Sequence, residues 1–340
     1  MGGMQMQKAF GEHMSGNDAV PVAPIPATMY KGWSNAYHLS NNELKVVVVP
    51  EIGRIAHLGW ADEPNLLRLN ELLWGETGKT VETDDWINFG GDWIWPVAQP
   101  HWPLFQDGNW PPSRLLDGRK WSGRAWRTED GTQHSLMTED FDPPISVRVH
   151  RTLRLPQEGA RLTVRQRLER LEPSDIPVTL WQLSQIADAD YMFIPVDEDS
   201  RFPGGLKPLL FEMPGTNILH RCGTIAVYQA GLGGEHKVGS DSPRRWIAAL
   251  RGDTLILQRT EPGDGEGPYP DGGCTVEAYA NTNAGYVEIE SLSVEGHPEP
   301  GTYMDNTLII TLYRLDPDIP RTPCALADWV REIVGEDVTR

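Results

Sequence analysis

Cysteine is scarce in this sequence, and its placement argues against two kinds of cross-linked protein. The three cysteines, Cys222, Cys274 and Cys324, lie far apart, and no C-x-x-C spacing occurs. The sequence therefore predicts neither a disulfide-rich framework nor a zinc site built on thiolates. A single disulfide is compatible with three cysteines, but their spacing does not indicate one. The nine histidines also lack the spacing of metal-ligating motifs, so we expect no metal site.

Basic residues are too few to suggest a polyanionic partner. Lysine and arginine number 30 against 48 aspartates and glutamates, which gives a formal net charge of −18. This balance argues against binding of nucleic acid, because phosphate backbones attract basic surfaces. It argues equally against polyanionic polysaccharides as ligands. The oligomeric state is left open by these features.

Long apolar runs are also absent. No stretch reaches the roughly 18 apolar residues that cross a membrane, so we expect no membrane contact. The N-terminal residues contain no apolar core of a secretory signal, which predicts a cytoplasmic protein. Residues 1–28 are rich in Gly, Met, Pro and Ala, and this composition predicts a flexible N-terminal arm.

Helical periodicity is rare, whereas the alternation typical of strands recurs along the chain. Ala160–Glu169, for example, alternates apolar residues such as Leu162 and Val164 with polar ones. Turn-forming Gly and Pro, 34 and 28 residues, separate the expected strands. The pattern predicts a mainly β protein with two large, mostly antiparallel sheets. We expect a single domain over residues 29–340, with one C-terminal helix over Cys324–Val334.

The segment Trp86–Trp126 contains seven of the thirteen tryptophans. They alternate with Gly, Pro, Asn, Asp, Gln and His rather than with aliphatic residues. Flat rings beside short polar groups suit a rigid ligand with apolar faces and many hydroxyls, such as a sugar. The sequence therefore predicts a saccharide-binding wall that includes Trp93, Trp95, Gln99 and Trp102. The alternative is a tryptophan-rich structural corner of a large β protein.

Two expected strands near the C-terminal end place acidic and aromatic side chains on common faces. The pleat groups Glu277 with Tyr279, and Tyr286 with Glu288 and Glu290. A short connection between the strands predicts a hairpin, in which the two faces would be contiguous. Carboxylates beside tyrosines in a cleft can act as a general base and as acceptors for ligand hydroxyls. A solvated outer face is the alternative interpretation.

Three further features suggest contacts with a ligand. Arg151 lies on an otherwise apolar strand face, so it either pairs with a buried carboxylate or holds a ligand oxygen. His101, between two prolines in the tryptophan-rich segment, is the best-placed histidine for proton transfer. The pair Gly90-Gly91 is suited to a tight turn at which backbone approaches a ligand closely.

The order of these motifs resembles an uncharacterised bacterial family. Asn88–Gln99 is similar to its N-x-G-G-x-x-x-W-P-x-x-Q segment, and Trp181–Gln185 is similar to its W-x-x-T/S-Q strand. Further similar segments include Tyr269–Gly273 and Tyr286–Glu290, so the resemblance extends over roughly residues 40–315. That family in turn resembles the galactose-mutarotase-like superfamily, which implies a β-supersandwich with a concave, sugar-binding face.

The resemblance implies aldose-1-epimerase chemistry, an isomerase reaction that interconverts sugar anomers with a glutamate base and a histidine acid and without a cofactor. Glu288 or Glu290 corresponds to the base. The strand that supplies the histidine in those epimerases here offers Gln182 and Gln185, and the acid is therefore assigned to His101. Arg151, Gln185 and Tyr279 are expected on the cleft floor. The alternatives are a non-catalytic carbohydrate-binding or sensing protein, and a lyase or isomerase of an unusual saccharide.

Overall fold

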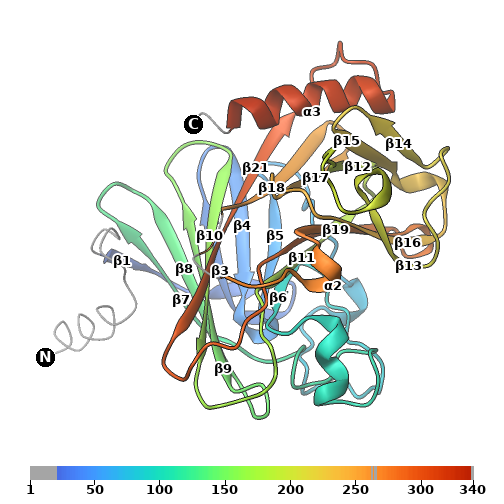
Figure 1. Cartoon of the computed structure of the whole chain (residues 1–340). Helices are drawn as coiled ribbons and strands as arrows, with labels where there is room; N and C mark the ends of the chain where they lie inside the picture. The colour runs from blue at the N-terminus through green and yellow to red at the C-terminus, as the bar shows by residue number, and fades with distance from the viewer. Residues whose placement is uncertain (1–20, 262, 264–265, 338–340) are drawn as a thin grey trace, which may run out of the picture.

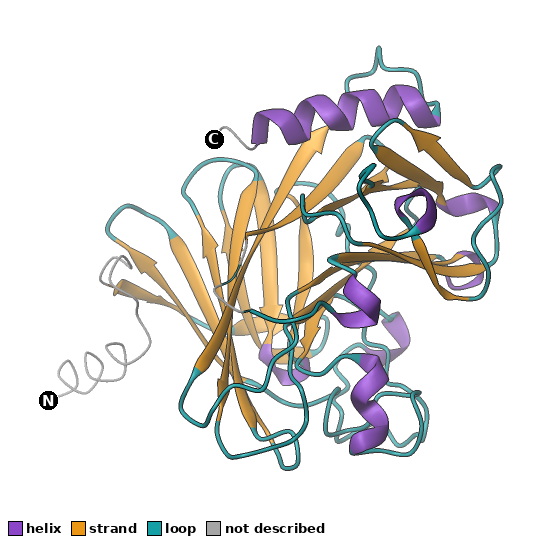
Figure 2. Ribbon diagram, in the orientation of Figure 1, coloured by secondary structure: helices purple, strands orange, loops and turns teal. Residues whose placement is uncertain are grey.

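Two large sheets dominate the computed structural model, which describes residues 21–261, 263 and 266–337. Neighbouring strands in this part of the chain pair in the antiparallel direction. Figure 2 shows mainly strands and connecting loops, with few helical segments. The mainly β, two-sheet architecture predicted from the sequence is therefore confirmed.

The first sheet has 11 strands, and α3 (Pro323–Asp337) covers part of its outer face. In hydrogen-bonded order its strands are β1 (Pro21–Ile25), β7 (Ser122–Thr128), β8 (Gln133–Phe141), β9 (Val147–Leu155), β10 (Arg161–Arg170), β21 (Tyr303–Arg314), β18 (Thr254–Glu261), β17 (Trp246–Arg251), β12 (Tyr191–Pro195), β15 (Ile225–Gln229) and β14 (Leu219–Cys222).

The second sheet has 10 strands and supports the candidate site. In hydrogen-bonded order its strands are β13 (Lys207–Leu210), β16 (Glu235–Ser240), β19 (Val276–Asn281), β20 (Tyr286–Leu292), β11 (Trp181–Ala187), β6 (Asp92–Trp95), β5 (Arg54–Trp60), β4 (Leu44–Val49), β3 (Trp33–Ser40) and β2 (Thr28–Tyr30). The remaining helical segments are short: α2 (Pro270–Gly273) and the 3-10 turns Pro50–Ile52, Glu71–Leu73, Gln99–Leu104, Pro203–Gly205, Ala230–Leu232 and Thr282–Ala284.

The main apolar core lies between the two sheets. Alternate residues such as Val46 and Val48 of β4, Val149 and Leu153 of β9, and Ile289 of β20 all belong to it and are fully buried. Each strand contributes every second side chain because successive residues point to opposite faces. On β20 the other face is buried as well, since it lies beneath the loops that enclose the candidate site.

Helix α3 contains the whole segment for which a C-terminal helix was predicted, and it lies across one end of the molecule in Figure 1. Leu326 and Val330 pack against Phe193 and Val227 of the 11-stranded sheet. A disulfide between Cys222, at the end of β14, and Cys324 connects the helix to that sheet. The cysteine spacing did not indicate this bond.

Two observations bear on the environment of the protein. No helix within the described residues is long and apolar enough to cross a membrane. The Cys222–Cys324 disulfide is of a kind that is uncommon in the reducing cytoplasm. The cytoplasmic location stays a prediction, and this bond counts against it.

The N-terminal arm predicted over residues 1–28 falls partly outside the described residues, which begin at residue 21. The described part differs from the prediction. Pro21–Ile25 forms β1 and pairs with β7, with a register irregularity between Pro21 and Ala23. A partner strand that is distant in sequence supplies these hydrogen bonds, so local composition did not reveal the strand.

Candidate functional site

A cavity of about 670 Å³ lies over β16, β19 and β20, on the face of the 10-stranded sheet that points away from the main core. Its walls come from the loop after β6, which is cyan to green in Figure 1, and from residues Leu209–Phe211 at the end of β13. Asp271 of α2 also borders it. Its volume is typical of small-molecule sites, which span about 300–1,000 Å³.

The register of β19 and β20 places acidic and aromatic residues side by side on the cavity floor. Glu277 lies opposite Glu290, and Tyr279 lies opposite Glu288. Tyr286 follows on the same face of β20. The hairpin with contiguous faces is therefore present as predicted, and four of these residues line the cavity while Glu290 is fully buried beneath it.

Glu288 is held from behind by two polar side chains. Gln185 donates from Nε2 to Glu288 Oε1 at 2.8 Å, and Arg68 donates from Nη1 to Gln185 Oε1 at 2.9 Å. This chain of bonds fixes the orientation of both the amide and the carboxyl group. Burial raises the pKa of Glu288 to about 8, and the neighbouring Glu290 adds to the rise. Glu288 is therefore largely protonated at neutral pH.

Lys237 links the other two glutamates of the floor. Its Nζ lies 2.8 Å from Glu277 Oε2 and 2.9 Å from Glu290 Oε2. Trp181 donates from Nε1 to Glu290 Oε2 at 2.8 Å. Burial opposes the charged form of Lys237, but the two glutamates overcome this effect and raise its pKa. Lys237 is consequently a fixed ammonium ion that donates hydrogen bonds, and it is unsuited to act as a nucleophile.

The two tyrosines of the floor act as neutral hydrogen-bonding groups. Tyr279 donates from its hydroxyl to Glu235 Oε1 at 2.7 Å and accepts from Asn281 Nδ2 at 3.0 Å. Tyr286 accepts from Asn88 Nδ2 at 3.5 Å. Burial raises the pKa of both tyrosines above the ordinary value. They can therefore bind ligand hydroxyls but are weak acids.

The tryptophans that line the cavity agree with the prediction only at Trp95. Trp93 and Trp102 are 1% and 0% exposed and are not among the residues that line the cavity, so the structure does not place them in contact with a ligand there. Trp95 lines the cavity although it is almost completely buried. The accessible rings are Trp86 and Trp110, whose centres lie 5.2 Å apart in a T-shaped arrangement. Trp110 is 53% exposed.

His101 lies outside the cavity, contrary to its predicted role as the acid. Its Nε2 is 2.7 Å from Glu295 Oε1. Gln99, two positions earlier in the same 3-10 turn, does line the cavity as predicted, and it donates from Nε2 to Asn109 O at 2.9 Å. Residues two apart on such a turn point in different directions. Within the described residues, the cavity lining contains no histidine.

Arg151 takes the structural alternative of its two predicted roles. It is fully buried on β9, and its Nη2 lies 2.5 Å from Asp92 Oδ1 of β6. Asp92 also accepts hydrogen bonds from Gln182 and from Ser184 Oγ. These groups lie between the sheets, on the face of β11 opposite to the face with Gln185. The assignment of Arg151 to the ligand site is therefore wrong.

The glycine pair Gly90-Gly91 brings two chain segments together. Their φ angles are 78° and 82°, and a Cβ atom on Gly90 would collide with the carbonyl oxygen of Arg68. Gly91 N donates to Arg68 O at 2.7 Å, and Arg68 N donates to Gln185 O at 2.9 Å. The close approach predicted for a ligand is thus made by the backbone that positions Arg68 behind the site.

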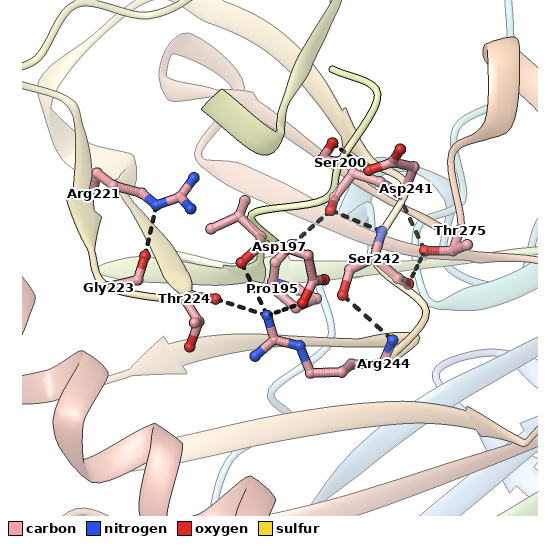
Figure 3. A network of polar contacts seen from close by, with 12 residues as sticks. Pro195, Asp197, Ser200, Arg221, Gly223, Thr224, Asp241, Ser242, Arg244 and Thr275 are labelled. Carbon is pink, nitrogen blue, oxygen red and sulfur yellow. Dashed lines mark hydrogen bonds and ion pairs between the residues drawn. The ribbon is translucent and has the colours of Figure 1, made fainter. Parts of the chain in front are cut away.

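A polar network anchors the segment that leads into the Leu209–Phe211 wall (Figure 3). Arg244 donates from Nη2 to Asp197 Oδ1 at 2.8 Å, and Ser200 donates from Oγ to Asp241 Oδ1 at 2.5 Å. These bonds tie the loop after β12 to the loop after β16. They therefore fix the start of the edge strand β13, whose far end borders the cavity.

The described residues offer no metal centre and no activated thiol. No three His, Cys, Asp or Glu side chains of residues 21–261, 263 and 266–337 are grouped to hold a metal ion. Cys274 is a free, buried cysteine, and burial raises the pKa of its thiol. A buried thiol of this kind is unreactive.

No protein-family model matches this sequence, and no curated protein matches it. Several solved structures do match. A galactose mutarotase-like protein from Lactobacillus casei has a TM-score of 0.53 and 11% identity, over 82% of this chain and 100% of that one. A proposed aldose 1-epimerase from Escherichia coli K12 has a TM-score of 0.52 and 12% identity, over 83% of this chain and 99% of that one. A galactose mutarotase related enzyme from Lactobacillus acidophilus has a TM-score of 0.52 and 10% identity, over 83% of this chain and 98% of that one.

This chain has the galactose-mutarotase-like fold. At identities of 10–12%, the similarity establishes the fold alone. The chemistry of this protein therefore has to be argued from its own residues. The cavity lining includes Trp86 and Trp110 of the tryptophan-rich segment, and Glu277 and Tyr286 of the acidic and aromatic strand faces. Lys237 in the lining and Arg68 behind it were not predicted as site residues.

Proposed function

We propose that the cavity binds a saccharide and that Glu288 interconverts the anomers of that saccharide, a reaction of the aldose-1-epimerase type. The observation that supports this proposal is a buried carboxyl group, held in place by Gln185, in a cavity bordered by accessible tryptophans. The galactose-mutarotase-like fold and its sugar-related neighbours add support.

The composition of the cavity suits a sugar. Trp86 and Trp110 offer flat apolar surfaces for the C–H faces of a pyranose ring. Gln99, Tyr279 and Asn281 offer hydrogen-bonding groups for hydroxyls. Ligand sites commonly combine apolar walls with a few oriented polar groups.

The reaction requires two proton transfers, at the two oxygen atoms bonded to the anomeric carbon. The anomeric hydroxyl loses a proton, the ring oxygen gains one, and the bond between C1 and the ring oxygen breaks to give the open-chain aldehyde. Rotation about C1–C2 and the reverse transfers close the ring as the other anomer. A neutral carboxyl group can donate from one oxygen and accept at the other, so it performs both transfers without a histidine.

Glu288 is suited to this bifunctional role because its pKa, raised by burial to about 8, keeps it protonated at neutral pH. The active form is then the neutral acid. We therefore expect the rate to be steady below about pH 8 and to fall as the carboxyl group ionises above that pH. This direction is opposite to that of a simple carboxylate base, whose rate would rise with pH.

Replacing Glu288 with Gln is expected to reduce the rate of anomer interconversion by about 100-fold or more, because the amide cannot exchange the proton. Polarimetry of freshly dissolved α-glucose and α-galactose, with the buffer rate subtracted, measures the effect. Glu235→Gln is the matched control, since it removes a carboxylate of the cavity without touching the contact between Gln185 and Glu288. A Glu288→Gln protein with the wild-type rate would overturn the proposal.

Replacing Trp110 with Ala is expected to weaken saccharide binding about tenfold, equivalent to about 1.4 kcal/mol. The exposed ring at the cavity supplies stacking area, and its removal also leaves Trp86 without its T-shaped partner. Titration of intrinsic fluorescence measures the affinity. Trp74→Ala is the control, because Trp74 is 37% exposed but does not line the cavity. Equal affinities of the two variants would contradict the placement of the sugar.

The second candidate function is non-catalytic carbohydrate binding. The observation that favours it is the position of His101, which pairs with Glu295 outside the cavity. Wild-type protein that binds sugars but gives no anomer interconversion above the buffer rate would favour this function over the epimerase.

A further inference from the structure

The cavity floor has an excess of acidic side chains. The charged groups at or beside it are Glu235 and Lys237 of β16, Glu277 of β19, Glu288 and Glu290 of β20, Asp271 of α2, Lys207 of β13, and Arg68 behind Gln185. Arg68 donates to Gln185, and Lys207 donates to the backbone carbonyl of Asp271. Lys237 is shared between two glutamates, which leaves one negative charge of that trio uncompensated when both are ionised.

Two glutamates of the floor, Glu277 and Glu290, have a carboxyl oxygen that accepts no hydrogen bond, and Glu277 is the one that lines the cavity. Glu277 is fully buried and lines the cavity, and its Oε1 accepts no hydrogen bond. A buried carboxyl oxygen without a donor is costly, so native structures seldom leave one unpaired. Lys237 contacts the other oxygen of the same group, at 2.8 Å. The free oxygen is therefore available to a donor that a ligand brings.

We infer that the saccharide is an amino sugar with a free ammonium group next to its anomeric carbon, and that Glu277 binds this group while Glu288 faces the anomeric hydroxyl. The inference rests on the proposed function and specifies its substrate class. An ammonium ion supplies the donor that Glu277 lacks and the positive charge that the floor lacks. Sugar phosphates and uronic acids are disfavoured, because they would add negative charge to this floor.

The register supports the placement of the two groups. Glu277 pairs with Glu290 and Tyr279 pairs with Glu288, so Glu277 and Glu288 are diagonal neighbours on one face. Diagonal neighbours lie about 7–8 Å apart between Cα atoms, and long side chains from such positions can converge. A 2-amino sugar presents its amino group and its anomeric hydroxyl on adjacent carbons, so both carboxyl groups can reach it together.

Proton release should accompany binding of the charged ligand. Burial raises the pKa of Glu277 well above its ordinary value, although Lys237 opposes this rise. An ammonium ion beside the group favours its ionised form. Any proton that Glu277 carries in the ligand-free protein is therefore released when an amino sugar binds, whereas a neutral sugar does not drive its release.

The test is isothermal titration calorimetry of the full-length protein at about pH 6.5, where simple amines are charged. The ligands are glucosamine, N-acetylglucosamine, glucose and choline. Two buffers with different ionisation enthalpies report proton release. We expect glucosamine to bind about tenfold or more tightly than N-acetylglucosamine and glucose. Glu277→Gln should abolish this preference and the proton release, so that its affinities for glucosamine and for glucose lie within about threefold of each other. The wild-type ligand comparison does not depend on the folding of that variant.

The other possible outcomes overturn the amino-sugar inference, and some of them also overturn the proposed function. Glucose or N-acetylglucosamine binding as tightly as glucosamine would overturn the inference and leave the proposed function standing. No binding of any sugar would overturn both. Tight binding of choline with no binding of sugars would assign the cavity to a cation without a saccharide and would also overturn both. A Glu277→Gln protein that retained the preference would refute the role of Glu277.

Discussion

Replacing Arg151 with Met is expected to lower the free energy of unfolding by about 3–5 kcal/mol. The guanidinium is fully buried between the sheets, and its partner Asp92 is 1% exposed. Methionine fills part of the space but leaves the carboxylate of Asp92 in the interior without a cation. Urea unfolding measures the effect. An unchanged m-value, which is the slope of the unfolding free energy against urea concentration, would show that the variant differs from wild type in stability.

The same strand provides a matched control. Arg148 of β9 pairs with Asp140 at 2.6 Å, but the two side chains are 35% and 51% exposed. Solvent screens such a pair, so Arg148→Met is expected to cost no more than about 1 kcal/mol. Adding Asp92→Asn to Arg151→Met should recover part of the loss, because the buried charge is removed. Equal losses in Arg148→Met and Arg151→Met would contradict the importance of the buried pair.

Replacing Lys237 with Met is expected to cost a similar amount, about 3–5 kcal/mol near neutral pH. The variant leaves Glu277 and Glu290, both fully buried, without the ammonium ion between them. Burial already raises the pKa of Glu277 despite Lys237, and loss of Lys237 raises it further. Thermal and urea unfolding at several pH values measure the change.

The pH dependence of this variant has a definite sign. A carboxyl group with a folded-state pKa above its unfolded-state value binds more protons in the native protein. Its contribution to stability is therefore complete below the unfolded-state value, near 4.5, and declines as the pH rises through the folded-state value. The deficit of Lys237→Met relative to wild type should be small at about pH 5 and larger at about pH 8.

The double variant Lys237→Met with Glu277→Gln separates charge from packing. It removes the ammonium ion together with one of its two carboxylates, so it should regain part of the stability lost by Lys237→Met alone. Glu277→Gln by itself keeps the pair between Lys237 and Glu290, and we expect its cost to be the smallest of the three. A deficit in Lys237→Met that does not change with pH would contradict the electrostatic explanation.

The strand pattern predicted much of the fold because it depends on local chemistry. Alternation in Ala160–Glu169 is realised in β10, where Leu162 and Val164 are fully buried. The apolar spacing of Cys324–Val334 is realised in α3. Strand β1 could not be predicted in this way, since its hydrogen bonds come from β7, about a hundred residues later.

Contacts between distant segments set the limits of prediction for the site. A tryptophan-rich segment indicates an aromatic surface, but tertiary packing decides that Trp93 of β6 and Trp102 are buried while Trp110 stays accessible. The direction of His101 depends in the same way on a single turn of 3-10 helix. Lys237 was overlooked as a site residue because β16 is short and its importance comes from Glu277 and Glu290 on other strands.

The sequence by itself determined the antiparallel two-sheet class, the C-terminal helix and the face shared by Tyr286, Glu288 and Glu290, because side-chain alternation follows from the geometry of each strand. Only the tertiary structure decided that this face lines a cavity, that Arg151 belongs to the core, and that Cys222 meets Cys324 across 102 residues. These outcomes depend on burial and on partners from other segments. Burial also raises the pKa of Glu288, so the chemistry proposed for that group arises from the fold.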